Sequence, residues 1–162
     1  MTTFVTVGNA TQPFDRLLEA VAAITAELPA PVIVQRGTCR QAHPGWQVFD
    51  YLEMGAFEEM VRNSRLVIMH GGAGSIINAV AGGKKPVVMP RRERRREHVD
   101  DHQLTFAEEL EREGYVFLAR EPEDLLGAVR AALAERPARG SEGPPPLVSE
   151  IAGLLDGWAH GR

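Results

Sequence analysis

Residues 70–75, His-Gly-Gly-Ala-Gly-Ser (the glycine loop), hold the pattern most suggestive of chemistry, because three of four consecutive positions are glycine. The apolar run 66–69 precedes them and the apolar segment 76–80 follows, which predicts a buried strand, a tight turn and a helix. The first N–H groups of a helix have no partner within it, and together with the helix dipole they attract an anion. Glycine has no Cβ, so a ligand can approach this backbone closely. The loop is therefore predicted to bind the phosphate of a nucleotide or sugar nucleotide.

The glycine loop differs from two common nucleotide-binding motifs. Ile77 stands where the third glycine of a dinucleotide fingerprint belongs, and the loop follows a strand in the middle of the chain. No Gly-Lys-Ser/Thr sequence follows it, so it is not a Walker A loop. The alternative is that the glycines serve only the close packing of a strand against a helix. Ser75 at the helix start, added to three glycines, favours phosphate binding over that alternative.

Residues 97–103, Glu-His-Val-Asp-Asp-His-Gln, allow three different roles. His98 and His102 stand four positions apart with two carboxylates between them, which suits a metal site, but the chain offers no third cluster of ligands. The second role is a capping box, in which Asp100 caps a helix and Gln103 reaches back to it. The third is hydrogen bonding to sugar hydroxyls, which need both donors and acceptors. No metal is expected here.

Residues 91–97 carry five Arg and two Glu, although the whole chain has a net charge of −4. The basic run is short, interrupted by Glu and set in an acidic chain, so nucleic acid is not expected as a partner. We expect a solvated loop that lies near a phosphate site or faces acidic lipid headgroups.

A chain of 162 residues suffices for one domain with a full core. The single cysteine, Cys39, excludes an internal disulfide framework and fits a reducing compartment. Its surroundings do not support a thiol enzyme, and we treat it as incidental. No apolar run approaches the roughly 20 residues that span a bilayer, and no signal peptide is recognised. These features predict a cytoplasmic protein that reaches a membrane only through a partner.

Apolar strand-like segments alternate with segments of helical periodicity along the chain. Strands are predicted at 4–7, 31–35, 46–49, 66–69, 86–90 and 115–118. Helices are predicted at 13–28, 58–62, 75–81, 101–113 and 122–133, with Pro13 in the first turn of the first one. This alternation predicts an α/β fold of the doubly wound, Rossmann-like kind, with a parallel sheet covered on both faces. Ligands of such sheets bind beyond the C-terminal ends of the strands, where the intervening loops share one edge.

The predicted domain covers residues 1–134, and a linker rich in Pro, Gly and charged residues follows at 135–146. At 147–158 the apolar residues fall on one face of a helix. This C-terminal amphipathic helix either packs back on its own sheet or crosses to another domain or chain.

Five segments together resemble a known family. They are 4–8 (Phe-Val-Thr-Val-Gly), 13–17 (Pro-Phe-Asp-Arg-Leu), 70–75, 86–91 (Pro-Val-Val-Met-Pro-Arg) and 97–103. The chain, from its start to about residue 110, resembles the C-terminal, donor-binding halves of GT-B glycosyltransferases of family 28. It is most similar to the small half-enzymes of that group. These include bacterial exopolysaccharide glycosyltransferase subunits and the catalytic subunit of the two-part N-acetylglucosaminyltransferase of dolichol-linked glycan assembly.

The resemblance implies a set of binding residues. The nucleotide and diphosphate of the donor would be held by Gly8, Asn9, His70, Gly72, Ala73, Gly74, Ser75 and Asn78. The donor sugar would be contacted by Asp101, His102 and Gln103. Many such domains carry a Glu that binds the ribose hydroxyls at the position of Asn78, so this chain lacks that bidentate carboxylate.

The resemblance also implies a reaction and partners. A UDP-sugar is the expected substrate and no cofactor is expected. Transfer is expected to be inverting and metal-independent, with a general base among His98, Asp101 and His102 or on the partner. A membrane-anchored partner subunit would bind the acceptor, a lipid-linked glycan, and would recruit this chain to the cytoplasmic face of the membrane. The alternatives are a non-enzymatic nucleotide-binding module and a protein like sugar-nucleotide epimerases. Self-association without the partner stays open.

Overall fold

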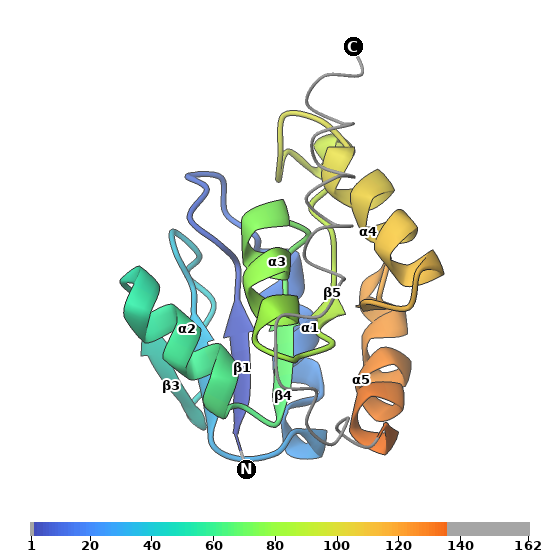
Figure 1. Cartoon of the computed structure of the whole chain (residues 1–162). Helices are drawn as coiled ribbons and strands as arrows, with labels where there is room; N and C mark the ends of the chain where they lie inside the picture. The colour runs from blue at the N-terminus through green and yellow to red at the C-terminus, as the bar shows by residue number, and fades with distance from the viewer. Residues whose placement is uncertain (1, 136–162) are drawn as a thin grey trace.

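The computed structural model describes residues 2–135, which form a parallel six-stranded sheet in the order β3-β2-β1-β4-β5-β6 (Figure 1). The strands are β1 (Thr3–Thr6), β2 (Val32–Gln35), β3 (Trp46–Phe49), β4 (Leu66–Met69), β5 (Val87–Val88) and β6 (Phe117–Leu118). The α-helices are α1 (Asp15–Ala23), α2 (Met54–Asn63), α3 (Ala73–Ala81), α4 (His102–Arg112) and α5 (Leu125–Ala134). Short 3₁₀ turns lie at η1 (Thr25–Glu27), η2 (Glu93–Arg95) and η3 (Pro122–Asp124). This architecture confirms the predicted doubly wound α/β fold.

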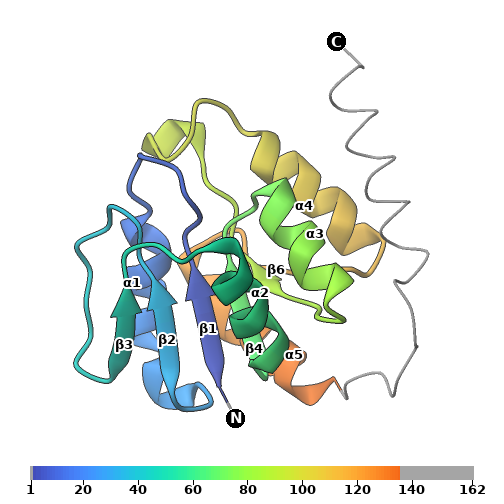
Figure 2. The same cartoon turned by 60° about the vertical axis from the view of Figure 1, so that its left-hand side comes forward.

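Helices cover both faces of the sheet (Figure 2). Because alternate residues of each strand point to opposite sides, an apolar core lies on each face. On one face, Val5, Val34 and Ile68 pack with residues of α1 and α5. On the other, Phe4 and Val67 pack with residues of α2, α3 and α4. The strand order reverses between β1 and β4, which is where ligands of open parallel sheets bind. The glycine loop follows β4 at this point.

The first predicted helix, 13–28, is wrong at both ends. Pro13 lies before the helix, since the helix starts at Asp15, and the Phe14 N–H donates to the Cys39 Sγ at 3.0 Å. The helix ends at Ala23 and a 3₁₀ turn follows. Thr25 contributes to this end, because its hydroxyl donates to the Val21 carbonyl at 2.9 Å and so competes with the regular backbone pattern.

The other elements agree in kind with the prediction and differ in extent. Strands β3 and β4 have the predicted bounds, while β5 and β6 are reduced to two residues each. Helix α2 begins four residues earlier than predicted, because the exposed Met54, Gly55 and Ala56 give no apolar periodicity. Helix α3 begins two residues earlier, so Gly74 lies in its first turn. Beyond residue 135, the predicted linker and C-terminal helix lie outside the described residues.

None of the helices in residues 2–135 combines the length and the apolar character that a bilayer-spanning helix requires.

Candidate functional site

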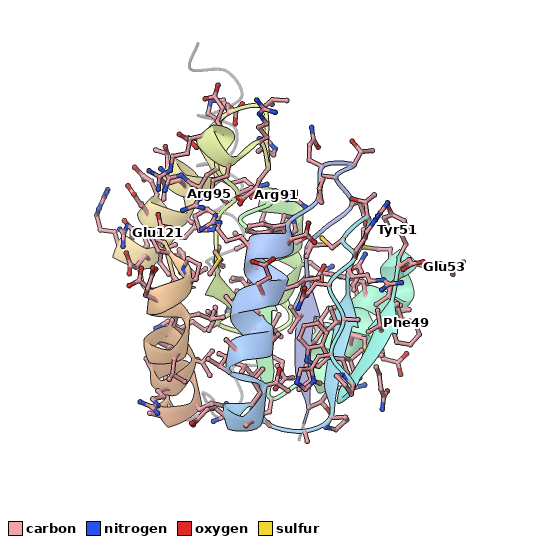
Figure 3. The ribbon with its side chains drawn as sticks, turned by 180° about the vertical axis from the view of Figure 1, so that it is seen from behind. Phe49, Tyr51, Glu53, Arg91, Arg95 and Glu121 are labelled. Carbon is pink, nitrogen blue, oxygen red and sulfur yellow. The ribbon has the colours of Figure 1, made fainter. Side chains whose placement is uncertain are left out.

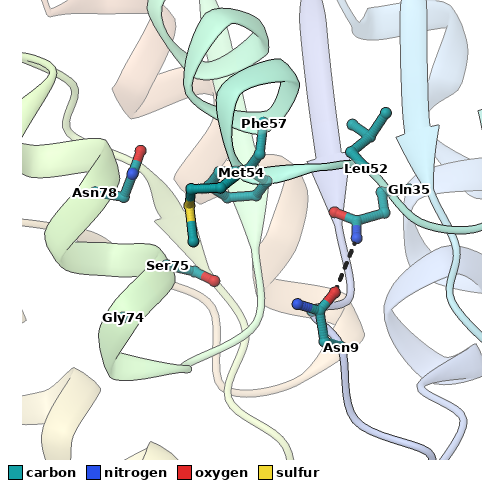
Figure 4. Close-up of a pocket in the computed structure, with 9 residues that line it drawn as sticks. Asn9, Gln35, Leu52, Met54, Phe57, Gly74, Ser75 and Asn78 are labelled. Atoms are coloured by element: carbon teal, nitrogen blue, oxygen red, sulfur yellow. Dashed lines mark hydrogen bonds between the residues drawn. The ribbon is translucent and has the colours of Figure 1, made fainter.

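A pocket of about 100 Å³ lies at the point where the strand order reverses (Figure 4). It is lined by Gly8, Asn9, Gln35, Leu52, Met54, Phe57, Gly74, Ser75 and Asn78. Five of the predicted nucleotide- and diphosphate-binding residues are thus brought together: Gly8, Asn9, Gly74, Ser75 and Asn78. Small-molecule sites usually enclose about 300–1,000 Å³. The pocket therefore encloses only part of a ligand the size of a nucleotide sugar.

The N-terminus of α3 forms one wall of this pocket. Gly72 precedes the helix and has no side chain that could cap it, while its carbonyl accepts the first helical hydrogen bond from the Ile76 N–H at 3.1 Å. A Cβ added at Gly74 would meet no atom of the described residues within 4 Å, so the space before this backbone is open. The Ser75 hydroxyl points into the pocket (Figure 4). Such a helix start offers backbone N–H donors and a positive dipole end to an anion.

His70 directly follows β4, and its buried ring packs between Gly8 and Gly72. A Cβ at Gly8 or Gly72 would lie 2.4 or 2.3 Å from the His70 Nε2, so glycine is needed at both positions to leave room for the imidazole. Burial, together with the charge of Arg91, lowers the pKa of His70 to about 3. The ring is therefore neutral at physiological pH. It shapes the loops but adds no positive charge to the site.

Asn78 contacts a carboxylate that the sequence analysis missed. Its Nδ2 donates to the Glu58 Oε1 on α2 at 3.1 Å, at the edge of the pocket. Helix α2 thus brings an acidic side chain next to Asn78, the position at which the family resemblance implies a Glu. The signal was weak, since Glu58 lies on an exposed helix face, 20 residues away from Asn78 in sequence.

Residues 97–103 do not line the pocket, and within the segment Asp100, His98 and His102 contact one another. The Asp100 carboxylate accepts the His102 N–H at 3.0 Å and faces the His98 and His102 Nδ1 atoms at 3.2 and 3.1 Å. Burial raises the pKa of Asp100, but the His102 N–H and the two imidazoles outweigh it, and the pKa is lowered overall. The Asp101 carboxylate accepts the Glu93 N–H at 3.0 Å and faces the Arg-rich loop.

The capping-box prediction is wrong for Gln103. Its Oε1 accepts the backbone N–H groups of Gly71 and Arg91, both at 3.1 Å, and does not reach back to Asp100. The residue that precedes α4 is also Asp101, not Asp100. Gln103 therefore joins the loops after β4 and β5, and only its NH₂ end is left to contact a ligand.

The prediction of a solvated basic loop is wrong for Arg91 and Glu97. Arg91 is fully buried, and its guanidinium donates to the carbonyls of Val7 and Gln12 at 2.7 Å and of Glu97 at 2.9 Å. Glu97 is also buried and forms a bidentate pair with Arg16, at 2.8 and 3.0 Å. The signal that could have revealed this is the position of Arg91, directly after an apolar strand segment.

Two exposed arginines of the same loop are paired as well. Arg94 and Arg95 contact the Glu121 carboxylate at 2.8 and 3.3 Å (Figure 3). One acidic side chain before η3 thereby fixes part of the basic run, which leaves less positive charge for lipid headgroups than the sequence predicts.

Cys39 has a structural role that the sequence analysis did not assign. Its buried sulfur accepts the Phe14 N–H just before α1, and burial raises the pKa of the thiol. A protonated, buried thiol is a poor nucleophile.

In residues 2–135, no group of three or more His, Cys, Asp or Glu side chains is arranged to hold a metal ion.

Three known proteins are similar to this chain, one in sequence and two in structure. The curated UDP-N-acetylglucosamine transferase subunit ALG13 of Yarrowia lipolytica is 33% identical over 88 residues, which is 54% of this chain and 41% of that protein. The calicheamicin glycosyltransferase CalG4 superposes with a TM-score of 0.63 at 20% identity, covering 98% of this chain and 44% of CalG4. MurG of Acinetobacter baumannii gives a TM-score of 0.58 at 20% identity, covering 95% of this chain and 49% of MurG. The two structural matches show the fold, that of one half of a GT-B glycosyltransferase.

The chain spans less than half the length of each of these relatives. The model of the glycosyltransferase family 28 C-terminal domain matches residues 2–144, most of the chain. The chain therefore belongs to the family of glycosyltransferase family 28 C-terminal domains.

Proposed function

We propose that this chain is the donor-binding, catalytic subunit of a two-component glycosyltransferase that uses a UDP-sugar. The observation that carries the proposal is the open start of α3, with Gly72, Gly74 and Ser75 at the reversal point of the sheet and no side chain capping the helix within the described residues. A diphosphate supplies the charge and the acceptor oxygens that such a helix start satisfies.

The same donors can serve the chemistry as well as the binding. When the sugar leaves, negative charge grows on the diphosphate, and fixed N–H groups stabilise that charge without reorganising. This supports transfer without a metal ion, and the proposed transfer is inverting and uses no cofactor. Asp101, His102 and the NH₂ end of Gln103 lie at the α4 start, where a neutral sugar with hydroxyl donors is a better ligand than an anion, because Asp100 and Asp101 carry negative charge there.

A general base for the acceptor hydroxyl has candidates in His98, Asp101 and His102. We favour His102, because the Asp100 carboxylate faces its Nδ1 at 3.1 Å and can fix the ring orientation and the tautomer. The side chain of His102 is 43% exposed, so an acceptor can approach it. The partner subunit remains the alternative source of the base.

Two observations support a partner subunit. The curated relative is named as a subunit, and the pocket encloses only about 100 Å³. We propose that a membrane-anchored partner supplies the acceptor side, binds a lipid-linked glycan, and brings the chain to the cytoplasmic face of the membrane. Exopolysaccharide assembly is one process that such a pair can serve.

The first experiment is a calorimetric titration of the purified chain with UDP, GDP and dTDP. We expect selective UDP binding. We expect Gly74→Val to abolish it, because the branched side chain fills the open space before α3. Ser75→Ala should weaken binding about tenfold through the loss of one hydrogen bond to a charged group. Gly127→Val in α5 is the matched control, since Gly127 is also a helical glycine with no neighbouring atom of the described residues within 4 Å of its Cβ position.

The outcomes separate the candidate functions. Binding of UDP without transfer, even with a partner present, favours a non-enzymatic nucleotide-binding module. Rapid transfer by the pure chain without a partner contradicts the two-component proposal, and isomerised donor supports an epimerase. If none of the three nucleotides binds, the proposed donor site is wrong for the isolated chain.

A further inference from the structure

We propose that Gln35 is a positioning residue, which, with Thr6, turns the amide of Asn9 so that its NH₂ group and not its carbonyl faces the pocket. The inference rests on the proposed function, since it explains how the wall opposite α3 suits a diphosphate. Gln35 and Thr6 do not need to touch the ligand.

Three consecutive hydrogen bonds connect Gly8, Thr6, Gln35 and Asn9 next to the pocket. The Gly8 N–H donates to the Thr6 Oγ1 at 3.1 Å, and the Thr6 hydroxyl donates to the Gln35 Oε1 at 2.8 Å. The Gln35 Nε2 then donates to the Asn9 Oδ1 at 3.2 Å (Figure 4). Four residues of β1, β2 and the loop after β1 are thus linked in one direction.

Burial fixes the direction of this series of hydrogen bonds. A backbone N–H can only donate, so the Thr6 oxygen accepts from Gly8. Thr6 is fully buried, so its own O–H needs an acceptor, and the Gln35 carbonyl oxygen is at hand. The opposite end of the Gln35 amide is then an NH₂ group, which requires an acceptor. The Asn9 carbonyl supplies it.

The series of hydrogen bonds ends at the exposed Asn9 and sets the orientation of its amide. With its Oδ1 turned towards Gln35, Asn9 presents its Nδ2 to a ligand. In Figure 4 this nitrogen lies on the side of Asn9 that faces Ser75 and Gly74. The pocket thus presents N–H donors from two walls, the α3 backbone and the Asn9 amide. A reversed Asn9 would point a carbonyl oxygen at the same place and would repel phosphate oxygens.

Gln35 itself is 2% exposed, so it is held as firmly as the core around it. It is a long polar side chain on β2, an interior strand between β3 and β1, where an apolar residue would cost less to bury. The hydrogen bonds explain how Gln35 is tolerated there, and the orientation of Asn9 explains what it contributes.

The test is a double-mutant cycle on UDP binding with Gln35→Met and Asn9→Ala. Methionine keeps the length of Gln35 but donates no hydrogen bond. We expect each single variant to weaken UDP binding about tenfold, and the double variant to bind no more weakly than Asn9→Ala alone. Losses that add up in the double variant would overturn the proposal, because Gln35 would then act independently of Asn9. Uridine, which has no phosphate, should bind all four proteins equally.

Gln47→Met is the matched control, because Gln47 is an exposed glutamine on the neighbouring strand β3. It should leave UDP binding unchanged. Circular dichroism at the titration temperature verifies that Gln35→Met is folded.

A ligand-free measurement keeps the inference separate from the proposed function. Side-chain ¹⁵N relaxation should show a rigid Asn9 amide in the wild type and a mobile one in Gln35→Met. Equal mobility in the two proteins would overturn the positioning role even if UDP binds. A rigid Asn9 that is released by Gln35→Met, in a chain that does not bind UDP, would retain the positioning role and refute the donor site.

Discussion

Two helices begin at the same edge of the sheet, and their N-termini are built in opposite ways (Figure 1). Helix α3 starts after Gly72 with small residues, and Gly72 has no side chain that could cap the helix. At the start of α4, the Asp100 carboxylate accepts the first helical N–H, that of His102, while Asp101 bonds the neighbouring basic loop. The first helix start is open to a ligand, whereas the second is partly satisfied by its own side chains.

The difference indicates which helix start suits which part of a donor. An anion gains most where no side chain occupies the N–H donors, which describes the start of α3, where Gly72 supplies no cap and the Glu58 carboxylate accepts from Asn78 further along the helix. At α4, two carboxylates oppose an anion but suit hydroxyl groups. The segment leading into α4 also stabilises the fold, because Arg91 and Glu97 are buried within it. We therefore expect substitutions near α4 to affect stability and substitutions near α3 to affect binding.

The largest expected effect is on stability, from Glu97→Ala. This variant leaves Arg16 buried without its partner and removes the acceptor of the Arg92 N–H at 3.0 Å. Breaking one side of a buried ion pair typically costs about 3–5 kcal/mol. Denaturation with urea should show this loss in the free energy of unfolding.

The matched control is Asp50→Ala, which breaks the exposed pair between Arg36 and Asp50 at 2.9 Å. Exposed pairs contribute about 0–1 kcal/mol, so this variant should unfold almost as the wild type does. Equal losses in the two variants would contradict the view that the segment before α4 is a structural anchor.

A smaller effect on stability is expected from pH, because the fold lowers the pKa of His70. The pKa of His70 is about 3 in the folded chain and 6.5 in the unfolded chain. Between these two pH values the unfolded chain binds a proton at His70 that the folded chain does not bind. The contribution of the neutral ring is complete above pH 6.5 and is lost as the pH falls towards 3. Between pH 7.5 and 5 the free energy of unfolding should therefore fall by about 2 kcal/mol.

His70→Gln is the comparison for this pH effect, because it removes the titrating ring and keeps a polar side chain. The variant should lose stability at neutral pH but should fall less steeply with pH than the wild type. Parallel pH profiles of the unfolding free energy would show that His70 is not the titrating group.

The sequence predicts the fold well where local pattern decides it. The runs at 46–49 and 66–69 give strands with the predicted bounds, and Gly114, with a φ of +83°, ends α4 as predicted. The first helix was overextended, because the apolar spacing continues through Ile24 while the hydrogen bond from Thr25 to Val21 ends the helix earlier. Local periodicity does not encode such a competing bond.

For the candidate site, the sequence indicates part of the backbone that lines the pocket but not the side chains that support it. Gly74 and Ser75 of the glycine loop line the pocket, whereas Gly72 leaves room for the His70 ring. The supporting side chains are joined across long stretches of sequence: Arg16 with Glu97 over 81 residues, and Gln35 with Asn9 over 26. Only the fold brings such residues together, so a single sequence cannot reveal the pairs.

The smallest expected effect on stability, with an opposite effect on binding, comes from Gly74→Ala. Alanine is favoured over glycine within a helix by up to about 1 kcal/mol, and an added Cβ at Gly74 meets no atom of the described chain within 4 Å. The variant should therefore be slightly more stable than the wild type. It should also bind UDP about tenfold more weakly, since the methyl group stands where phosphate oxygens approach the backbone.

Gly127→Ala in α5 separates these two effects, because it offers the same gain in helix stability far from the pocket. It should raise the unfolding free energy in urea by a similar amount and leave UDP binding unchanged. If Gly74→Ala bound UDP as tightly as Gly127→Ala, the diphosphate would not lie against the first turn of α3. The uncapped start of α3 would then have no role in diphosphate binding, and its contrast with the start of α4 would not bear on function.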